Sequence, residues 1–259
     1  MLWYKSWLEI RIRLAICVAG ILLVSWISLR EERPRIMENA RHPLAAQRLE
    51  PAVRQSLAQH STDFNYMWLI FFNTAVALVV PLFATVLAGT GINTQTSYGM
   101  RQGIHPSTQY TLSLPVSRAQ LFASRVGVGW LAVFTLLLVS FASLPFWARI
   151  VHVDVSFLDI APLALCALAG SIAFFHISTF VSVFVDEMWQ SFTAYAIIGA
   201  LYYLFTHVPS LAPYSFFRLM SGELYLLHGG LPLAPIFVCL LLAAMLHLAT
   251  LQFLKRREF

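Results

Sequence analysis

Six apolar stretches, each close to the length of a membrane-spanning helix, dominate this sequence. A helix needs about 20 mostly apolar residues to cross a bilayer, because each residue advances it by only about 1.5 Å. With 59% hydrophobic and 11% charged residues, the chain lies far below the charged content of about 25% that is usual in soluble domains. We therefore predict an all-α integral membrane protein in a single domain, with six spans at residues 12–29, 67–88, 121–146, 161–185, 189–207 and 233–254.

The first apolar stretch admits two interpretations. Lys5, Arg11 and Arg13 precede it, as basic residues precede the apolar part of a cleaved signal peptide. The stretch ends in Ser28-Leu29-Arg30-Glu31-Glu32, which lacks the small residues of a cleavage site. We therefore expect the segment to be retained as the first span.

The basic residues do not orient these spans by themselves. Six spans place both termini on one side, and Lys and Arg usually collect in cytoplasmic loops. The predicted spans divide the 17 Lys and Arg residues nine to eight, with nine on the side of the termini. The cluster Lys255-Arg256-Arg257 and the basic N-terminal tail favour cytoplasmic termini. Because the basic residues are scattered over both sides, they indicate anchoring to membrane lipid and no nucleic-acid partner.

Three connecting segments are longer than a turn. Residues 30–66 are polar, and we expect an outer loop with one or two short helices outside the bilayer, acting either as a gate or partner contact or as a solvated cap. Residues 207–232 are too apolar for a free loop and too interrupted by Pro and Gly for a span, so they are expected to lie in the interface or to dip back into the membrane. Their aromatic residues suit the headgroup layer: Tyr214, Phe216, Phe217 and Tyr225.

The third segment, residues 89–118, ends in signals for a sharp helix start. Ser117 and Gln120 have the spacing of a capping box, in which each side chain accepts a hydrogen bond from the other residue's backbone N–H. Val116 and Leu121 have the spacing of the accompanying hydrophobic staple. Pro115 keeps the residue before it out of helical geometry. The sequence thus predicts a corner at residues 115–117, from which the third span descends.

Residues for membrane-enzyme chemistry are missing from this chain. Its two lysines, Lys5 and Lys255, do not belong to a phosphate-binding P-loop, so the chain is not expected to hydrolyse ATP alone. His176 and His247 fall inside spans, where ionisable groups are functional candidates. They suggest haem ligation or a proton relay on one interpretation, and neutral histidines bonded to neighbouring helices on the other. The cysteines lack a CxxC pair and indicate small core residues without a disulfide or metal: Cys17, Cys166 and Cys239.

The stretch TLSLPVSRAQLFASRVGVGW, together with the six-span layout, resembles the membrane-permease subunit of type 2 ABC transporters. In that family the loop between spans two and three commonly ends in a Leu-Ser-Leu-Pro-Val-Ser-Arg-like sequence. The segment APYSFFRL before the last span is similar to the family's re-entrant stretch. The sharp motif covers about residues 107–125, and the layout covers most of the chain.

The resemblance implies a half-transporter in the cell membrane, with both termini cytoplasmic. Two copies would form the pathway, and each would bind a separately encoded ATPase that carries Mg-ATP, so the chain itself would need no cofactor. A coupling helix in the cytoplasmic loop 89–118, mapping onto residues 98–112, would contact the ATPase. Where family members often carry Glu followed by Gly-Thr, this chain has GIHPS at residues 103–107. The expected ATPase contacts are Tyr98, Arg101, His105 and Tyr110.

The expected function is therefore that of an exporter's permease subunit with an unidentified substrate. One alternative is a membrane anchor or assembly partner that binds an ATPase without transporting anything. The other is an intramembrane haem or redox protein that uses His176 and His247.

Overall fold

Four of the predicted spans form long apolar helices in the computed structural model. It describes residues 2–40, 68–88, 93–95, 102–104, 117–150, 152, 156–185 and 187–256. Among these residues, four helices are long and apolar enough to cross a membrane: α1 (Leu2–Ala40), α6 (Arg118–Ile150), α7 (Phe157–Val181) and α11 (Leu233–Arg256). In α1 and α6 the apolar part is Leu2–Ile27 and Ala119–Ile150, respectively. The chain is therefore a helical protein suited to a membrane.

The second and fifth predicted spans are also helical, but they are not among these four. The second consists of the π-helix η2 (Trp68–Val79), which runs directly into α4 (Val80–Leu87). Pro81 lies at the start of α4, where its missing N–H interrupts the ladder of backbone hydrogen bonds and marks the change of helix type. The fifth is α8 (Glu187–His207), whose glutamine and tyrosines make it less apolar than the others.

The first helix departs most from the prediction. It begins at Leu2 and continues to Ala40, so residues 30–40 extend the helix where we expected the outer loop to begin. The sequence of this extension is rich in Arg and Glu, which favour helix, and the helix continues through Pro34. The rest of the predicted outer loop, residues 41–66, lies outside the described residues.

The ends of the other helices shift by a few residues. α7 begins at Phe157, before the predicted residue 161, because the Ser156 side chain caps the helix by accepting a hydrogen bond from Leu158 N–H at 3.3 Å. It ends at Val181, and turns replace the last predicted residues of that span. α6 continues past the predicted residue 146 to Ile150, with Pro145 inside it.

A short hairpin replaces part of the predicted coupling helix. β1 (Asn93–Gln95) pairs antiparallel with β2 (Gln102–Ile104), with Thr94 opposite Gly103. A helix over residues 98–112 is therefore wrong for residues 102–104. Gly103 disfavours helix and the β-branched Ile104 favours strand, which explains the difference.

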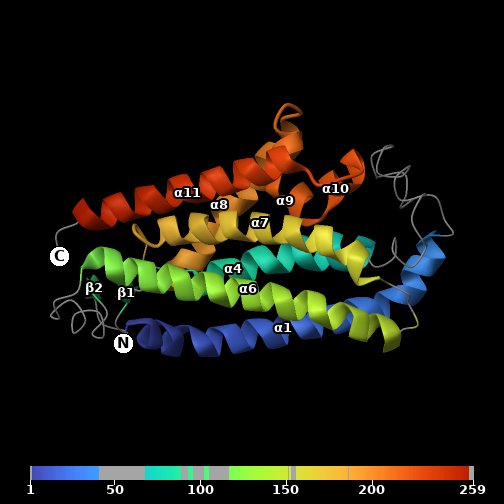
Figure 1. Ribbon diagram of the computed structural model, residues 1–259, viewed down its shortest axis with the longest axis horizontal. Coiled ribbons are helices and arrows are strands. Elements are labelled where there is room, and N and C mark those ends of the chain that lie inside the picture. The colour runs from blue at the N-terminus through green and yellow to red at the C-terminus, as the bar shows by residue number, and fades with distance from the viewer. Residues whose placement is uncertain are drawn as a thin grey trace.

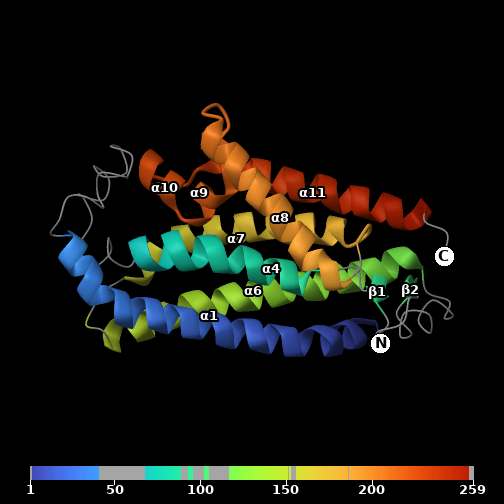
Figure 2. The same cartoon turned by 180° about the vertical axis from the view of Figure 1, so that it is seen from behind.

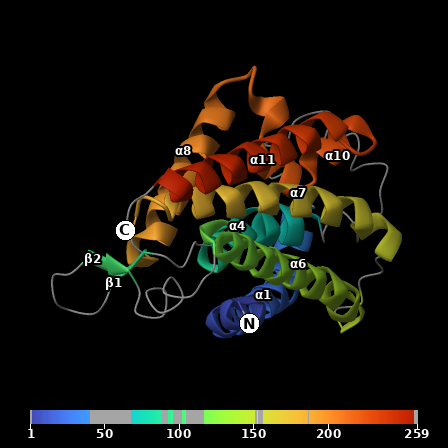
Figure 3. The same cartoon turned by 60° about the vertical axis from the view of Figure 1, so that its left-hand side comes forward.

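The helices run side by side along the longest axis of the molecule, with both termini at one end (Figure 1). α1 packs along α6, whereas α7 lies between α11 on one side and α4 and α6 on the other (Figure 3). α8 crosses this array obliquely, and β1 and β2 lie at the end that holds the termini (Figure 2). The hairpin and the start of α6 therefore both lie at the terminal end of the bundle.

The opposite end of the bundle holds three short helices. They are η3 (Ala212–Tyr214), α9 (Phe216–Met220) and α10 (Glu223–His228), which connect α8 to α11. The largest buried side chains of the core are mainly aromatic and lie on η2, α6 and α7, namely Trp68, Phe71, Phe72, Phe122, Phe174 and Phe175.

Candidate functional site

The start of α6 has both hydrogen bonds of the predicted capping box. Ser117 N–H donates to Gln120 Oε1 at 3.1 Å, and Gln120 N–H donates to Ser117 Oγ at 3.2 Å. The first helical hydrogen bond, from Leu121 N–H to the Ser117 carbonyl, measures 3.1 Å. Two otherwise unpaired N–H groups are thus satisfied where the helix begins. Pro115 and Val116, the other residues of the predicted corner, lie outside the described residues.

An ion pair fixes this end of α6 to α1. The Arg125 guanidinium donates a hydrogen bond to the Glu9 carboxylate. The Arg125 side chain is 9% exposed and that of Glu9 is 34% exposed, so most of the pair is screened from solvent. One residue before Arg125, the Ser124 hydroxyl lies 3.5 Å from the Ser6 hydroxyl, and both serines are buried. A displacement of the first turns of α6 would therefore act directly on α1.

The sequence interpretation missed this ion pair. It treated Arg125 only as a basic residue at the membrane surface. A signal was available, because Glu9 is the only acidic residue among the first 30 and stands inside a largely apolar helix. Since a carboxylate in such a position needs a partner, a basic residue near the start of another span was the natural candidate.

A second polar cluster holds the end of α4. Gln190 of α8 donates from Nε2 to the Ala88 carbonyl at 3.1 Å and to Ser178 Oγ at 3.2 Å. Ser178 Oγ in turn donates to the Thr85 carbonyl at 3.2 Å. Gln190 and Ser178 are both buried. Because Ala88 is the last described residue before the 89–116 segment, this cluster joins the start of that segment to α7 and α8.

Replacing Gln190 with leucine is expected to lower the free energy of unfolding by about 1 kcal/mol. The change removes two hydrogen bonds within the helical bundle, where each contributes about 0.6 kcal/mol on average. Unfolding of the full chain in detergent micelles, followed by circular dichroism, measures the effect. Gln252→Leu is the matched control, since Gln252 is exposed on α11. Equal losses in the two variants would contradict the role of the cluster.

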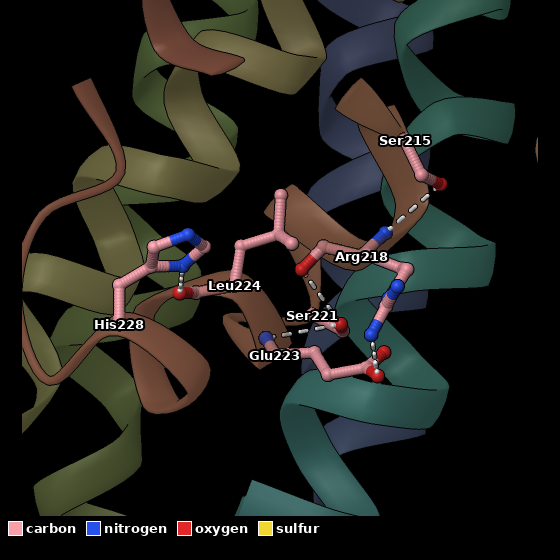
Figure 4. Close-up of polar contacts among 6 residues, drawn as sticks. All are labelled: Ser215, Arg218, Ser221, Glu223, Leu224 and His228. Carbon is pink, nitrogen blue, oxygen red and sulfur yellow. Dashed lines mark hydrogen bonds and ion pairs between the residues drawn. The ribbon is translucent and has the colours of Figure 1, made fainter. Parts of the chain in front are cut away.

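The short helices at the opposite end form a compact polar network around α9 and α10 (Figure 4). Arg218 pairs with Glu223 at 2.8 Å, and its backbone N–H donates to Ser215 Oγ at 3.4 Å. The Ser221 hydroxyl donates to the Arg218 carbonyl at 3.1 Å, and the Ser221 carbonyl accepts a hydrogen bond from the Trp68 indole at 2.8 Å. These contacts attach the connection between α8 and α11 to η2.

The aromatic residues in the connection between α8 and α11 differ in how exposed they are. Tyr214 is 41% exposed, as a residue of the headgroup layer would be. Phe216 and Phe217 are buried instead, with ring centroids 5.9 and 5.2 Å from that of Phe174 on α7. Both rings therefore pack within the bundle, and their place in the headgroup layer stays a prediction. They occupy one turn of α9, whose apolar side packs on α7.

The two intramembrane histidines come together although they belong to different helices. Their ring centroids are 5.4 Å apart, with His176 on α7 and His247 on α11. Trp130 of α6 donates from Nε1 to His176 Nε2 at 3.1 Å. This bond fits the expectation of a histidine held by a neighbouring helix. The proximity of the second histidine was not predicted, because the sequence does not reveal which helix faces meet.

The four expected ATPase contacts lie outside the described residues, namely Tyr98, Arg101, His105 and Tyr110. Their roles stay predictions. No protein-family model, curated protein or solved structure matches this chain. The function must therefore be inferred from the residues themselves and from their arrangement.

Proposed function

We propose that this chain is the membrane permease subunit of an ABC-type exporter of the type 2 class. The observation that carries the proposal is the capped start of α6, which lies within the family-like stretch and is tied to α1 by Arg125 and Glu9. The full proposal has six spans, with η2 and α4 together as the second and α8 as the fifth. Both termini are cytoplasmic, in agreement with their common end of the bundle (Figure 1).

In this proposal the 89–116 segment receives the force of the ATPase. The segment follows Ala88, which Gln190 holds, and precedes Ser117, where the capped start of α6 lies. A push on the segment would act on α7 and α8 through the hydrogen bonds around Ala88, and on α1 through the start of α6 and its ion pair with Glu9. The chain needs no catalytic residue of its own, because Mg-ATP is hydrolysed on the separately encoded partner. A second permease copy completes the pathway.

The decisive experiment purifies the full chain with the ATPase encoded beside it and reconstitutes the complex in lipid vesicles. The expected result is Mg-ATP hydrolysis that depends on the permease and is accompanied by movement of a solute or lipid across the membrane. Hydrolysis without any movement would favour the alternative of a non-transporting anchor. Failure of the two proteins to associate would refute the proposal.

Variants of Ser117 test the role of the α6 start within this complex. Ser117→Ala removes the capping oxygen at a cost of about 1 kcal/mol in helix initiation, whereas Ser117→Asp keeps an acceptor at the same position. We expect transport per ATP to fall in the alanine variant and to be retained in the aspartate variant. Equal transport per ATP in the two would show that the corner does not transmit force.

The packing around His176 and His247 does not favour the haem alternative. The rings of Trp130, Phe175 and Phe122 lie against the two imidazoles, at centroid distances of 5.1 to 5.5 Å. A macrocycle between the histidines would have to displace these rings. We therefore do not propose haem ligation.

A further inference from the structure

The hydrogen bond from Trp130 determines which nitrogen of His176 carries the proton. An indole N–H can only donate, so Nε2 of His176 is the acceptor and its lone pair is occupied. A neutral imidazole with an accepting Nε2 carries its hydrogen on Nδ1. The Nδ1–H group of His176 is buried and has no hydrogen-bond partner among the described residues. His176 itself is 1% exposed, so bulk solvent does not reach this donor.

His247 offers a second unsatisfied nitrogen beside it. Its Nδ1 atom is also buried without a hydrogen-bond partner among the described residues. Buried polar groups in native structures are nearly always paired, so two orphans on adjacent rings call for an explanation. They belong to parallel helices, α7 and α11, which pack closely along their lengths (Figure 1).

A proton is the ligand that suits two imidazoles best. A metal ion such as zinc needs three or four protein ligands, and no group of three or more His, Cys, Asp or Glu residues that could hold one occurs in the part of the chain that the structure describes. A proton needs one lone pair to bind and gains from a second base close by. A charged N–H also forms a stronger hydrogen bond than a neutral one.

We propose that His176 and His247 form an internal proton-binding site whose occupancy is reported by Trp130. The incoming proton adds to the Nε2 lone pair of His176 and replaces the hydrogen bond from Trp130, with no other bond broken. The Nδ1–H of the charged ring is a stronger donor than that of the neutral ring, so His176 turns to donate to Nδ1 of His247, which requires the hydrogen of His247 to be on Nε2. The charge is thereby stabilised by a neutral base, and both orphan nitrogens gain a partner.

A cavity beside Trp130 can accept the displaced indole ring. Trp130 borders a cavity of about 350 Å³ between α6 and α7, whose apolar walls include Gly127, Phe134 and Leu168. In the protonated state His176 and Trp130 both present N–H groups to each other, which is unfavourable. Rotation of the indole toward the cavity relieves this contact. Proton binding would therefore change the shape of this cavity between α6 and α7.

The charged groups of the neighbouring helices do not occupy this site. The rings next to the two histidines belong to Trp130, Phe122 and Phe175, none of which titrates near neutral pH. α4 has no titratable residue, and Arg125 of α6 is paired with Glu9. The other titratable residues of the described parts of α6, α7 and α11 lie at least eight positions along their helices from Trp130, His176 or His247, and are Arg118, Arg149, Asp159, Cys166, Cys239, Lys255 and Arg256. Those of α8 are Glu187, Tyr195, Tyr202, Tyr203 and His207.

The test follows the indole N–H signal of Trp130 by nuclear magnetic resonance. The full chain, labelled isotopically at its seven tryptophans, is placed in lipid nanodiscs, and Trp130→Phe identifies the signal. Between about pH 8 and pH 3, a range that extends to acid because burial disfavours the charged form of an imidazole, we expect this signal to move along a single titration curve. If the chemical shift of the Trp130 indole does not change over the whole pH range, the proposal is refuted regardless of the results for the histidine variants.

Two histidine variants separate the pair from other sources of pH dependence. His247→Phe keeps a ring but removes the second base, so the movement of the Trp130 signal is expected to disappear from this range. His228→Gln is the matched control, since His228 contacts its own helix through the Leu224 carbonyl at 2.7 Å. Its titration curve is expected to match that of the wild type. An unchanged midpoint in His247→Phe would overturn the shared site, and His247→Gln repeats this test if the phenylalanine variant does not fold. The outcome is independent of the proposed transport function, because no ATPase is present.

Discussion

Replacing Glu9 with glutamine is expected to lower the free energy of unfolding by about 3 kcal/mol, the low end of the range for removing one partner of a buried ion pair. The cost arises because Arg125 keeps its charge but loses the carboxylate that compensates it. The Arg125 side chain is only 9% exposed, so water cannot take over this role. The 34% exposure of Glu9 places the expected cost at the low end. Unfolding of the full chain in mixed micelles, followed by circular dichroism, measures the loss.

Two further variants show whether the loss of the ion pair is the cause. The double variant Glu9→Gln with Arg125→Met removes both charges and is expected to recover most of the lost stability. Glu223→Gln breaks the ion pair with Arg218, whose side chain is 24% exposed and therefore less buried than that of Arg125, so it is expected to cost less than Glu9→Gln. If the double variant were as unstable as Glu9→Gln alone, the loss would come from packing and not from charge.

Local signals in the sequence were sufficient to predict a hydrogen bond where its donor and acceptor lie within one helical turn of each other. The capping box at Ser117 and Gln120 is such a case, since three residues separate the groups and the chain between them has little freedom. The apolar length of the first, third, fourth and sixth spans likewise predicted the four helices that are long and apolar enough to cross a membrane. These features depend on composition and short spacing alone.

Contacts between helices could not be predicted in this way. Arg125 and Glu9 are separated by 116 positions, and Gln190 and Ala88 by 102. Their pairing depends on which faces of the helices meet, and apolar residues surround most of each span, so the hydrophobic pattern does not mark the buried face. The same reason explains why His176 and His247 were treated as separate residues.

The extent of α1 was missed for a different reason. A change from apolar to charged residues was taken as the end of the helix, although charge determines where a helix leaves the membrane and not where it stops. Residues 30–40 are charged but favour helix, so α1 continues beyond its apolar part to Ala40. Polarity and helix propensity therefore have to be judged separately at the end of a span.

Replacing Gly129 with alanine is expected to destabilise the bundle by about 2 kcal/mol, a typical cost of overpacking a core. A methyl group at this position would lie 2.4 Å from Cζ and 2.6 Å from Cε2 of Phe175, and 3.7 Å from the Leu87 carbonyl oxygen. Phe175 is 1% exposed and its ring packs against His176, so moving the ring aside toward the cavity that it borders breaks this contact. Gly129 therefore allows α6 to approach α7 at the point where α4 ends.

The chain offers a matched control for this prediction on α8. A methyl group at Gly199 would have no atom within 4 Å, so Gly199→Ala should be neutral or stabilising by up to about 1 kcal/mol through better helix propensity. Combining Gly129→Ala with Phe175→Leu shortens the opposing side chain and is expected to restore part of the stability. The three variants are compared by unfolding in the same micelles. A loss at Gly199 equal to that at Gly129 would mean that the contact of Gly129 with Phe175 does not limit the packing of α6 on α7.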